Sequence, residues 1–435
     1  MFESPQAAGE RIVVTGLGAV STWGWGAARL WSGLTCGDTG IAVSRRFDTR
    51  GHRTEVVGET PDPPAEVTAE LSRWPHCSQA DRFAMAAAVE ACRQAGLIAS
   101  PLAAAEPLGP GAGVFLGGST GGMAEDEEFF RQLVAGNPRA ARLRLLASHQ
   151  LNGPGDEVAR LLGVAGPVRS FSSACASGAL AIGAALDALR GGEVETAITG
   201  GSDSLCQLTY AGFNSLRAVD PRPCRPFRRE RAGLSLGEGS GILILETAAR
   251  ARARGVRPLA ELLGAGASCD AHHMTAPDPS GAGAALAVER ALRDAAVDPG
   301  AVDFINAHGT GTPHNDAAEW QAMRKVFGAR AASIPVTSTK GSVGHLLGSS
   351  GAIEAVATVQ CLLAGSVHPT PGEGHLDEAC GVDLVHPEAR RLPPPAAGEA
   401  ALAVSTSFGF GGANAALVLA GRGGLQTGDR REPAS

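Results

Sequence analysis

Cys175 occupies a position at which a thiol could act as a nucleophile. It ends the apolar run VRSFSSAC (residues 168–175), which is typical of a buried strand, and the small residues after it open an Ala-rich helical stretch. The free N–H groups and the positive dipole at the start of a helix lower the pKa of a thiol placed there. The sequence therefore predicts a thiolate at Cys175, whereas Cys92 and Cys361, within helical runs, are expected to be buried and inert.

Two histidines lie at comparable positions far along the chain. His308 follows a strand-like run in INAHGTGTPHND, and His345 lies in STKGSVGHLLGSSGAIE, five residues after Lys340. A single histidine viewed alone is more often structural than catalytic. Two histidines at matched strand ends, together with Cys175, are harder to attribute to a structural role alone.

The segment SFGFGG (residues 407–412) is the third feature with chemical potential. Gly409, Gly411 and Gly412 surround Phe410 after a strand-like run. Glycines on both sides let a backbone N–H approach a ligand while the ring moves. A plain hairpin turn is the alternative interpretation.

Apolar β-branched runs that alternate with Ala-rich stretches must position these residues. Strand-like runs cover residues 11–21, 113–119, 168–175, 196–201, 241–246, 302–310, 334–340, 401–410 and 414–420. Helix-like stretches at 176–192 and 349–365 each end in glycine. The alternation predicts a layered α/β fold with buried sheets. Because a strand, an Ala-rich helix and two further strands recur in that order, we predict two related halves, residues 11–255 and 256–420, followed by a flexible tail, 421–435.

Composition excludes several other classes of protein. The 435 residues have a net charge of −7, which argues against general binding of nucleic acid or anionic membranes. Nine cysteines without a CxxC motif indicate reduced thiols rather than a disulfide framework or a zinc ribbon. The first ten residues lack the features of a signal peptide, and no run of 18 apolar residues occurs. We therefore expect a cytoplasmic protein.

These residues carry a resemblance to a known family. The blocks RIVVTGLGAVS, SSACASG, RPFRRERAGLSLGEGSGILILE, CDAHHMTAP, INAHGTGTPHNDAAE, STKGSVGHLLGSSGAIE and TSFGFGGANAALVL occur in family order, and the chain resembles a β-ketoacyl-acyl carrier protein synthase of the thiolase-like condensing enzymes. The resemblance implies a five-layered αβαβα architecture of two duplicated halves. It also implies an acyltransferase that condenses malonyl-carrier with a Cys-bound acyl chain in fatty acid or polyketide biosynthesis, including polyene systems.

The resemblance also assigns roles to individual residues. Cys175 would accept the acyl chain, and its backbone N–H and that of Phe410 would form the oxyanion hole. His308 and His345 would donate hydrogen bonds during decarboxylation. The remaining roles it implies are a charged pair behind the histidines at Lys340 and Glu354, gating by Phe408, Gly409, Phe410 and Asp270, and binding of the phosphopantetheine arm by Thr310 and Thr312.

Partners and cofactors follow from the same resemblance. We expect an acyl carrier protein that brings its own 4′-phosphopantetheine, no other cofactor, and a homodimer or a heterodimer with a chain-length-factor-like homologue. The family's carrier is acidic, and residues 217–231 hold six arginines, so we expect docking at Arg225, Arg228 and Arg229.

The adjacent His272 and His273 lack further spaced ligands, and no metal site is expected. The segment 119–168, which in the family helps to line the acyl pocket and the dimer contact, matches the family poorly.

Three other functions compete with this interpretation. GGSTG (residues 117–121) fits the GxSxG motif of a serine hydrolase with Ser119 as nucleophile. A non-catalytic chain-length-factor-like subunit would lack the nucleophile, and a degradative thiolase would carry a second cysteine where this chain has SFGFGG. GLGAV near Gly16 is not a dinucleotide-binding motif, since Ser21 replaces the third glycine.

Overall fold

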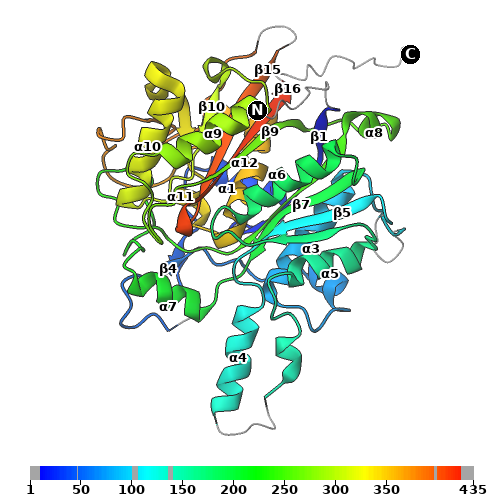
Figure 1. Ribbon diagram of the computed structural model, residues 1–435. Coiled ribbons are helices and arrows are strands. Elements are labelled where there is room, and N and C mark those ends of the chain that lie inside the picture. The colour runs from blue at the N-terminus through cyan, green and yellow to red at the C-terminus, as the bar shows by residue number, and fades with distance from the viewer. Residues whose placement is uncertain (1–9, 47, 100–105, 136–140, 396–398, 423–435) are drawn as a thin grey trace, which may run out of the picture.

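The computed structural model describes residues 10–46, 48–99, 106–135, 141–395 and 399–422 (Figure 1). The strands are β1 Ile12–Ser21, β2 Gly24–Trp25, β3 Ala42–Val43, β4 Val56–Val57, β5 Ala112–Gly117, β6 Val168–Phe171, β7 Thr196–Asp203, β8 Gly239–Thr247, β9 Ala260–Cys269, β10 Phe304–Asn306, β11 Pro335–Thr337, β12 Ser366–Val367, β13 Asp383–Leu384, β14 Arg390–Arg391, β15 Ala400–Phe408 and β16 Ala413–Arg422. All nine strands expected from the sequence are present, and β9 is an additional long strand.

Helices connect most of these strands. The α-helices are α1 Ala27–Thr35, α2 Ala65–Leu71, α3 Gln79–Gln94, α4 Met123–Val134, α5 Gly153–Leu162, α6 Ser177–Arg190, α7 Gln207–Ser215, α8 Ala248–Ala253, α9 Ala282–Asp294, α10 Pro313–Phe327, α11 Lys340–Val343 and α12 Ser350–Ala364. Short 3-10 helices are η2 Leu143–Leu146, η3 Pro299–Ala301, η4 Gly328–Ala332, η5 Leu347–Ser349 and η6 Phe410–Gly412. The expected helices at 176–192 and 349–365 correspond to α6 and α12.

The strand directions repeat along one continuous sheet path. In the first half, β1, β8 and β7 pair antiparallel in turn, and β7, β5 and β6 pair parallel. In the second half, β9, β16 and β15 pair antiparallel in turn, and β15, β10 and β11 pair parallel. Antiparallel pairing of β1 with β9 joins the two halves. The recurrence of strands inferred from the sequence is therefore visible in the sheet topology.

Helices α6 and α12 lie between the two halves of the sheet. They contact each other, and each also contacts strands of both halves. On the outer faces, α3 packs against β1 and β8, whereas α9 packs against β9 and β16 (Figure 1). The expected domain boundary at residue 255 falls between α8 and β9, and β16 continues through Arg422, so the expected tail overlaps this strand. Residues 423–435 lie outside the described part of the chain.

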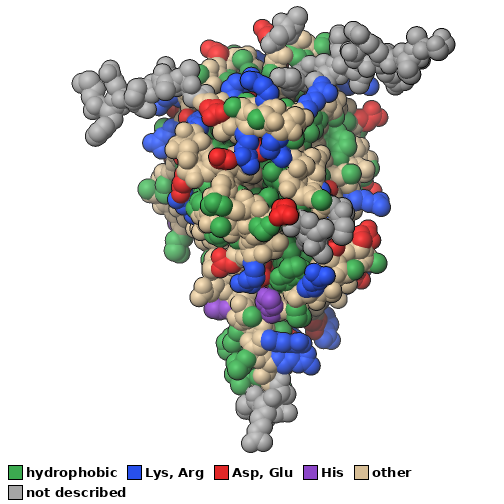
Figure 2. All heavy atoms as spheres, turned by 90° about the vertical axis from the view of Figure 1, so that its right-hand side faces the viewer, with side chains coloured by type: hydrophobic (Ala, Val, Ile, Leu, Met, Phe, Trp, Pro, Cys, Tyr) green, Lys and Arg blue, Asp and Glu red, His purple; other side chains and the backbone are tan. Residues whose placement is uncertain are grey.

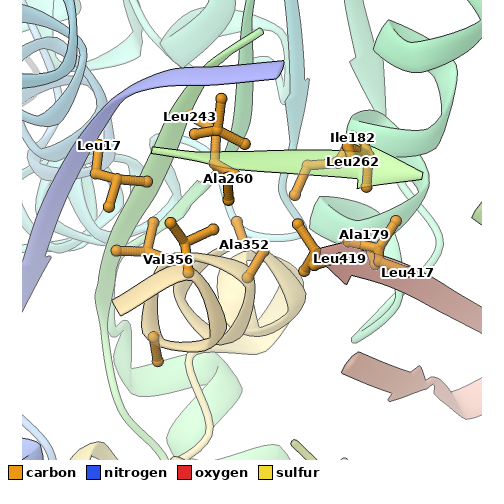
Figure 3. Close-up of a cluster of buried hydrophobic side chains, with 14 of the residues drawn as sticks. Leu17, Ala179, Ile182, Leu243, Ala260, Leu262, Ala352, Val356, Leu417 and Leu419 are labelled. Atoms are coloured by element: carbon orange, nitrogen blue, oxygen red, sulfur yellow. The ribbon is translucent and has the colours of Figure 1, made fainter. Parts of the chain in front are cut away.

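Small side chains permit close contact between the central helices and the strands. In Figure 3, Ala352 and Val356 of α12 lie against Leu17, Leu243 and Leu262 of the surrounding strands. These side chains are buried and belong to one hydrophobic cluster. Within the described residues, one segment, Leu347–Ala364, has the length and mean hydropathy (1.3) of a membrane span, but 83% of it is buried inside the protein.

A finger-like projection extends from the body of the molecule at α4 and η2. Figures 1 and 2 show it at the bottom, and Figure 2 shows basic and hydrophobic side chains exposed there. The hydrophobic ones include Phe130, Val134 and Leu143, which are 54%, 82% and 75% exposed. Further along the chain, after α5, strand β6 forms one edge of the sheet. The poorly matched segment 119–168 thus includes an exposed projection, whereas Val158, Ala159 and Leu162 of α5 within it are buried in the core.

Two helical glycines provide a matched test of the central packing. A Cβ at Gly351 of α12 would lie 2.9 Å from the Cβ and the backbone N of Ala179 in α6, whereas a Cβ at Gly212 of α7 would meet nothing within 4 Å. We expect Gly351→Ala to lower the free energy of unfolding by about 1–3 kcal/mol through overpacking. Gly212→Ala should raise it by up to about 1 kcal/mol because alanine favours the helix. Chemical denaturation measures both changes, and a stabilising Gly351→Ala would contradict this packing.

Candidate active site

A strained turn between β6 and α6 presents the Cys175 thiol. Ala174, directly before it, has a φ of 47°, in the left-handed region that non-glycine residues seldom adopt. Ser177 stabilises this turn, since its hydroxyl donates to the Ala174 carbonyl at 2.6 Å and accepts from Ser173 N–H at 2.8 Å. The sequence places small residues here, so the strand can turn sharply into the helix and leave the thiol at the helix N-terminus.

His308 follows β10, and its backbone is anchored by buried acceptors. Its N–H donates to Glu319 Oε1 at 2.9 Å and to Thr406 Oγ1 at 3.0 Å. Its Nδ1 lies 3.1 Å from Lys340 Nζ. Because an ammonium group can only donate, Nδ1 is the acceptor and the ring proton resides on Nε2.

His345 lies between α11 and η5 and is fixed in the same tautomer by a different donor. The backbone N–H of Leu347 donates to its Nδ1 at 3.0 Å, and Ser350 Oγ lies 3.1 Å from the same atom. A backbone N–H cannot accept, so the proton of His345 also resides on Nε2. The two histidines therefore offer the same kind of hydrogen-bond donor.

The structure brings the thiol and both imidazoles together. Cys175 Sγ and one ring nitrogen each of His308 and His345 lie within 4.8 Å of one another. The two rings are 5.6 Å apart between centroids and nearly perpendicular, at 88°. Three residues separated by up to 170 positions in the chain thus share one site, as the sequence predicted.

Burial keeps both imidazoles neutral. The pKa of His308 lies well below 6.5, mainly because the ring is desolvated and secondarily because Lys340 is close. Desolvation also lowers the pKa of His345 to about 3. Neutral rings with a proton on Nε2 can donate a hydrogen bond to an anion but do not serve as acids in their resting form.

The prediction that the helix N-terminus makes Cys175 a thiolate is wrong for the resting site. Burial raises its pKa to about 11, although the nearby Lys340 and the backbone N–H groups of Phe410 and Cys175 act in the opposite direction. Desolvation of an anion exceeds these favourable contributions because Cys175 is buried, with 7% of the residue exposed at the cavity. The resting residue is a thiol, and its proton must leave as the nucleophile attacks.

Lys340 and Glu354 form a buried ion pair behind His308. Both side chains are 1% exposed, and Lys340 Nζ donates to Glu354 Oε1. Burial raises the pKa of Glu354 to about 7, while Lys340 lowers it. Since the ammonium group also contacts His308, the pair orients the imidazole without touching the cavity.

The glycine-rich segment approaches the thiol through its backbone. A Cβ at Gly409 would lie 3.0 Å from the Ser173 carbonyl oxygen and 3.2 Å from the Cys175 nitrogen, so only glycine fits without displacement. This close approach directs the backbone N–H of Phe410 toward Cys175 Sγ. The ring of Phe410 stacks on Phe213 at 5.6 Å, and that of Phe408 lies 5.7 Å from His308.

A cavity of about 390 Å³ opens onto these groups. Thr310 and Thr312 line it, as does Asp270, which accepts from Asn414 Nδ2 at 2.7 Å. Thr312 also caps α10, since its side chain accepts a hydrogen bond from the backbone N–H of Asn315. Lining residues that were not expected at the site are Phe213, Arg217, His314 and Asn414. His314 and Asn414 lie within the family motifs and Arg217 begins the basic segment 217–231, but nothing in the spacing of Phe213 marks it.

The expected docking arginines are largely unavailable. Arg225 and Arg228 are 5% and 1% exposed, and Arg225 pairs with Asp220 at 2.8 Å. Their prediction as a docking surface is wrong because the segment folds inward. Arg229 is exposed, but it lies 3.6 Å from Glu378 in an adjacent acidic segment.

The geometry at Ser119 contradicts a serine hydrolase. Its hydroxyl donates to Asp203 Oδ2 at 2.9 Å and accepts from Gly348 N–H at 3.1 Å. These partners include no histidine that could remove the hydroxyl proton, so the GxSxG pattern is accidental.

Among the residues that the structure describes, two groups of ligand-type side chains lie close enough to share an ion. In the first, Cys175, His308 and His345, both Nε2 atoms carry protons and are not free to coordinate. In the second, His76, Cys77 and Glu157, the carboxylate already pairs with Arg160. His273 Nδ1 accepts backbone N–H bonds from Thr275 and Ala276, consistent with a loop role.

Comparison with known proteins decides the family. Models described as the N-terminal and C-terminal domains of beta-ketoacyl synthase match residues 9–251 and 259–372. The chain belongs to the β-ketoacyl synthase family. A 3-oxoacyl-[acyl-carrier-protein] synthase 2 from Synechocystis sp. is 38% identical over 417 residues, covering 94% of this chain and 98% of the relative.

Solved structures extend the likeness to the fold. The ishigamide ketosynthase/chain length factor superposes with a TM-score of 0.86 at 33% identity, covering 95% of this chain and all of that chain. A type II polyketide synthase acyl-carrier protein in complex with its ketosynthase bound to the hexaketide gives 0.84 at 29% identity, with coverage of 95% and 100%. The chain therefore has the mixed α/β, thiolase-like fold of ketosynthases, and it is a condensing acyltransferase of fatty acid or polyketide synthesis.

The raised pKa of Cys175 has a measurable consequence. Below about pH 11 the thiolate fraction rises tenfold per pH unit, so alkylation of Cys175 by iodoacetamide should accelerate about tenfold per unit between pH 7 and 9. Peptide mass spectrometry follows Cys175, with the exposed Cys36 and Cys269 as internal references. A rate that levels off below pH 8 would contradict a buried neutral thiol.

Proposed function

We propose that Cys175, His308 and His345 catalyse decarboxylative condensation of malonyl-carrier with an enzyme-bound acyl chain. The observation that supports this most directly is the approach of the three reactive atoms to within 4.8 Å at the base of one cavity. The nucleophile and both donors are present, which argues against a non-catalytic chain-length-factor-like subunit. The glycine-rich segment SFGFGG itself contains no cysteine, which argues against a degradative thiolase.

The first half-reaction is acyl transfer to Cys175. The sulfur attacks the carrier thioester, a new S–C bond forms, the bond to the pantetheine sulfur breaks, and the thiol proton passes to the departing sulfur. The N–H groups of Cys175 and Phe410, which already face Sγ, would stabilise the tetrahedral oxyanion.

The second half-reaction requires stabilisation of an enolate. As carbon dioxide leaves malonyl-carrier, the electron pair moves to the thioester oxygen, where His308 and His345 donate from Nε2. The carbanion then attacks the acyl carbon on Cys175, and a C–C bond forms. The S–C bond breaks with its electron pair on Sγ, which takes up a proton from solvent as the β-ketoacyl product leaves. Lys340 and Glu354 act indirectly, since Lys340 fixes the proton of His308 on Nε2.

The cavity fits a pantetheine arm that arrives on its carrier. The proposal assigns Thr310 and Thr312 to hold the arm and Asp270, Phe408, Gly409 and Phe410 to gate its entry, and all of these residues line the cavity. The protein itself then needs no cofactor and no metal.

The carrier should dock at the cavity mouth rather than on the buried arginines. Arg217 is exposed, lines the cavity and has a φ of 53° that turns the chain there. An acidic carrier, which the family resemblance implies, would be attracted to this cation. The neighbouring Leu216 is 55% exposed and adds apolar surface to the same rim.

The effect of Arg217 on carrier docking can be measured separately from the acyl-transfer step at Cys175. We expect Arg217→Glu to slow acylation by acyl-carrier roughly tenfold while acylation by a small acyl thioester stays near wild type, because only the carrier is charged and large. The matched control is Arg229→Glu, which lies beside its own acidic partner. If Arg217→Glu slowed acylation by acyl-carrier and acylation by the small thioester equally, docking at this rim would be contradicted.

Assembly and architecture complete the proposal. We propose that the exposed apolar side chains of the finger and the edge strand β6 meet a second copy or a chain-length-factor-like homologue. The contacts of α6 and α12 with both half-sheets support a five-layered αβαβα arrangement. We further propose a cytoplasmic location, in keeping with its nine free cysteines.

The two half-reactions should separate in variants. With acyl-carrier, intact-mass analysis should detect an acyl adduct on the wild type and on His345→Ala but none on Cys175→Ala, whereas Cys92→Ala should behave as wild type. His345→Ala removes one donor to the thioester oxygen, and we expect this variant to decarboxylate malonyl-carrier about 100- to 1000-fold more slowly than wild type. An adduct on Cys175→Ala, or normal decarboxylation after replacing both histidines, would contradict the assignment.

A further inference from the structure

Asp203 is a buried carboxylate that the proposed reaction does not use. It ends β7 in the first half of the chain and is 0% exposed. Five donors converge on it: the backbone N–H groups of Ser119, Thr120 and Gly348 and the hydroxyls of Ser119 and Thr120. Burial raises the pKa of Asp203, and these donors act against that shift. A carboxylate that receives so many N–H and O–H groups is fixed in position.

The contact with Gly348 connects Asp203 to the active site. Gly348 N–H donates to Asp203 Oδ2 at 2.6 Å, and the same N–H lies 3.1 Å from Ser119 Oγ. Gly348 belongs to η5, the short turn whose first residue, Leu347, donates its N–H to His345 Nδ1 at 3.0 Å. The N–H that sets the tautomer of His345 and the N–H held by Asp203 therefore belong to consecutive residues, Leu347 and Gly348.

The backbone at Leu347 needs an external restraint. Its φ is 52°, a left-handed conformation that a branched non-glycine residue adopts only when its surroundings impose it. The hydrogen bond from the next residue to Asp203 supplies such a restraint. Without it, the turn can relax, and the Leu347 N–H no longer points at His345 Nδ1.

We propose that Asp203 is a positioning residue that holds the Leu347–Ser349 turn and thereby fixes His345 as an Nε2–H donor toward the cavity. The inference rests on the proposed role of His345. Because Asp203 lies in the first half of the chain and His345 in the second, the carboxylate also ties the geometry of the donor to the contact between the halves. His308 has its own restraint from Lys340 and does not depend on Asp203.

A double-mutant cycle tests whether Asp203 acts through His345. Asp203→Asn keeps the shape of the side chain but turns one acceptor oxygen into a donor that opposes the converging N–H groups. We expect kcat for malonyl-carrier decarboxylation to fall about 10- to 100-fold with KM little changed, since misorientation of a catalytic group costs rate rather than binding. Acyl transfer to Cys175, followed by intact mass, should stay within about twofold of wild type.

In the His345→Ala background, the same Asp203→Asn change should produce no further loss of decarboxylation, because the group it positions is gone. Thr199→Val is the matched control for disturbing β7. Thr199 lies four residues before Asp203 in this strand, and the change removes the buried hydrogen bond from its hydroxyl to the Phe115 carbonyl. This control should leave both half-reactions near wild type. Where Asp203→Asn does not fold, Asp203→Glu, which keeps the charge and shifts the carboxylate by one methylene, enters the same cycle.

The outcomes separate this inference from the proposed function. Equal losses in the wild-type and His345→Ala backgrounds, parallel losses of acyl transfer and decarboxylation, or an unchanged decarboxylation rate in Asp203→Asn would overturn the role of Asp203 alone. An unchanged decarboxylation rate in His345→Ala itself would overturn the proposed role of His345 and, with it, this inference.

Discussion

Desolvation of two imidazoles beside a thiol is the constraint on which the site depends. Inside the protein, His308 and His345 lose the water that would stabilise their charged forms, so both are neutral. Neutral imidazole carries one proton, and its position decides whether the ring donates or accepts at the cavity. Lys340 and the Leu347 N–H occupy the two Nδ1 atoms, and both rings therefore donate from Nε2. A charged intermediate would meet fixed dipoles instead of mobile water.

The repeated topology explains how residues distant in sequence reach this one place. Cys175 follows β6 and precedes α6, and His345 lies between β11 and α12, the corresponding elements of the second half. Ser119 and His308 likewise follow the corresponding strands β5 and β10. Because α6 and α12 pack against each other between the half-sheets, the carboxyl ends of equivalent strands converge at their shared boundary. The two halves thus supply different chemical groups from matching positions.

Local pattern and motif were sufficient to predict the strands, the central helices and the convergence of the thiol with two histidines. The strand β9 was not predicted, since AELLGAGASC has no β-branched residue and its partner strands are remote in the chain. The ionisation of Cys175 was mispredicted because the helix N-terminus is visible in sequence whereas the degree of burial is not. Arg225 and Arg228 failed as docking residues for the same reason, since a run of arginines does not reveal which side chains fold inward. The tautomers of the histidines depend on donors within the second half, and the role of Asp203 depends on a contact between the halves, and none of these contacts is visible in a local pattern.

The most direct test of the account is the ionisation and tautomeric state of the two histidines. Long-range ¹H–¹⁵N correlation spectra of histidine-labelled protein, assigned with His308→Ala and His345→Ala, report both properties between pH 5 and 8. The account predicts that each ring stays neutral and protonated on Nε2 across this range, given a His345 pKa of about 3 and a His308 pKa well below 6.5. A titration midpoint near 6.5, or a proton on Nδ1 of either ring, would contradict it.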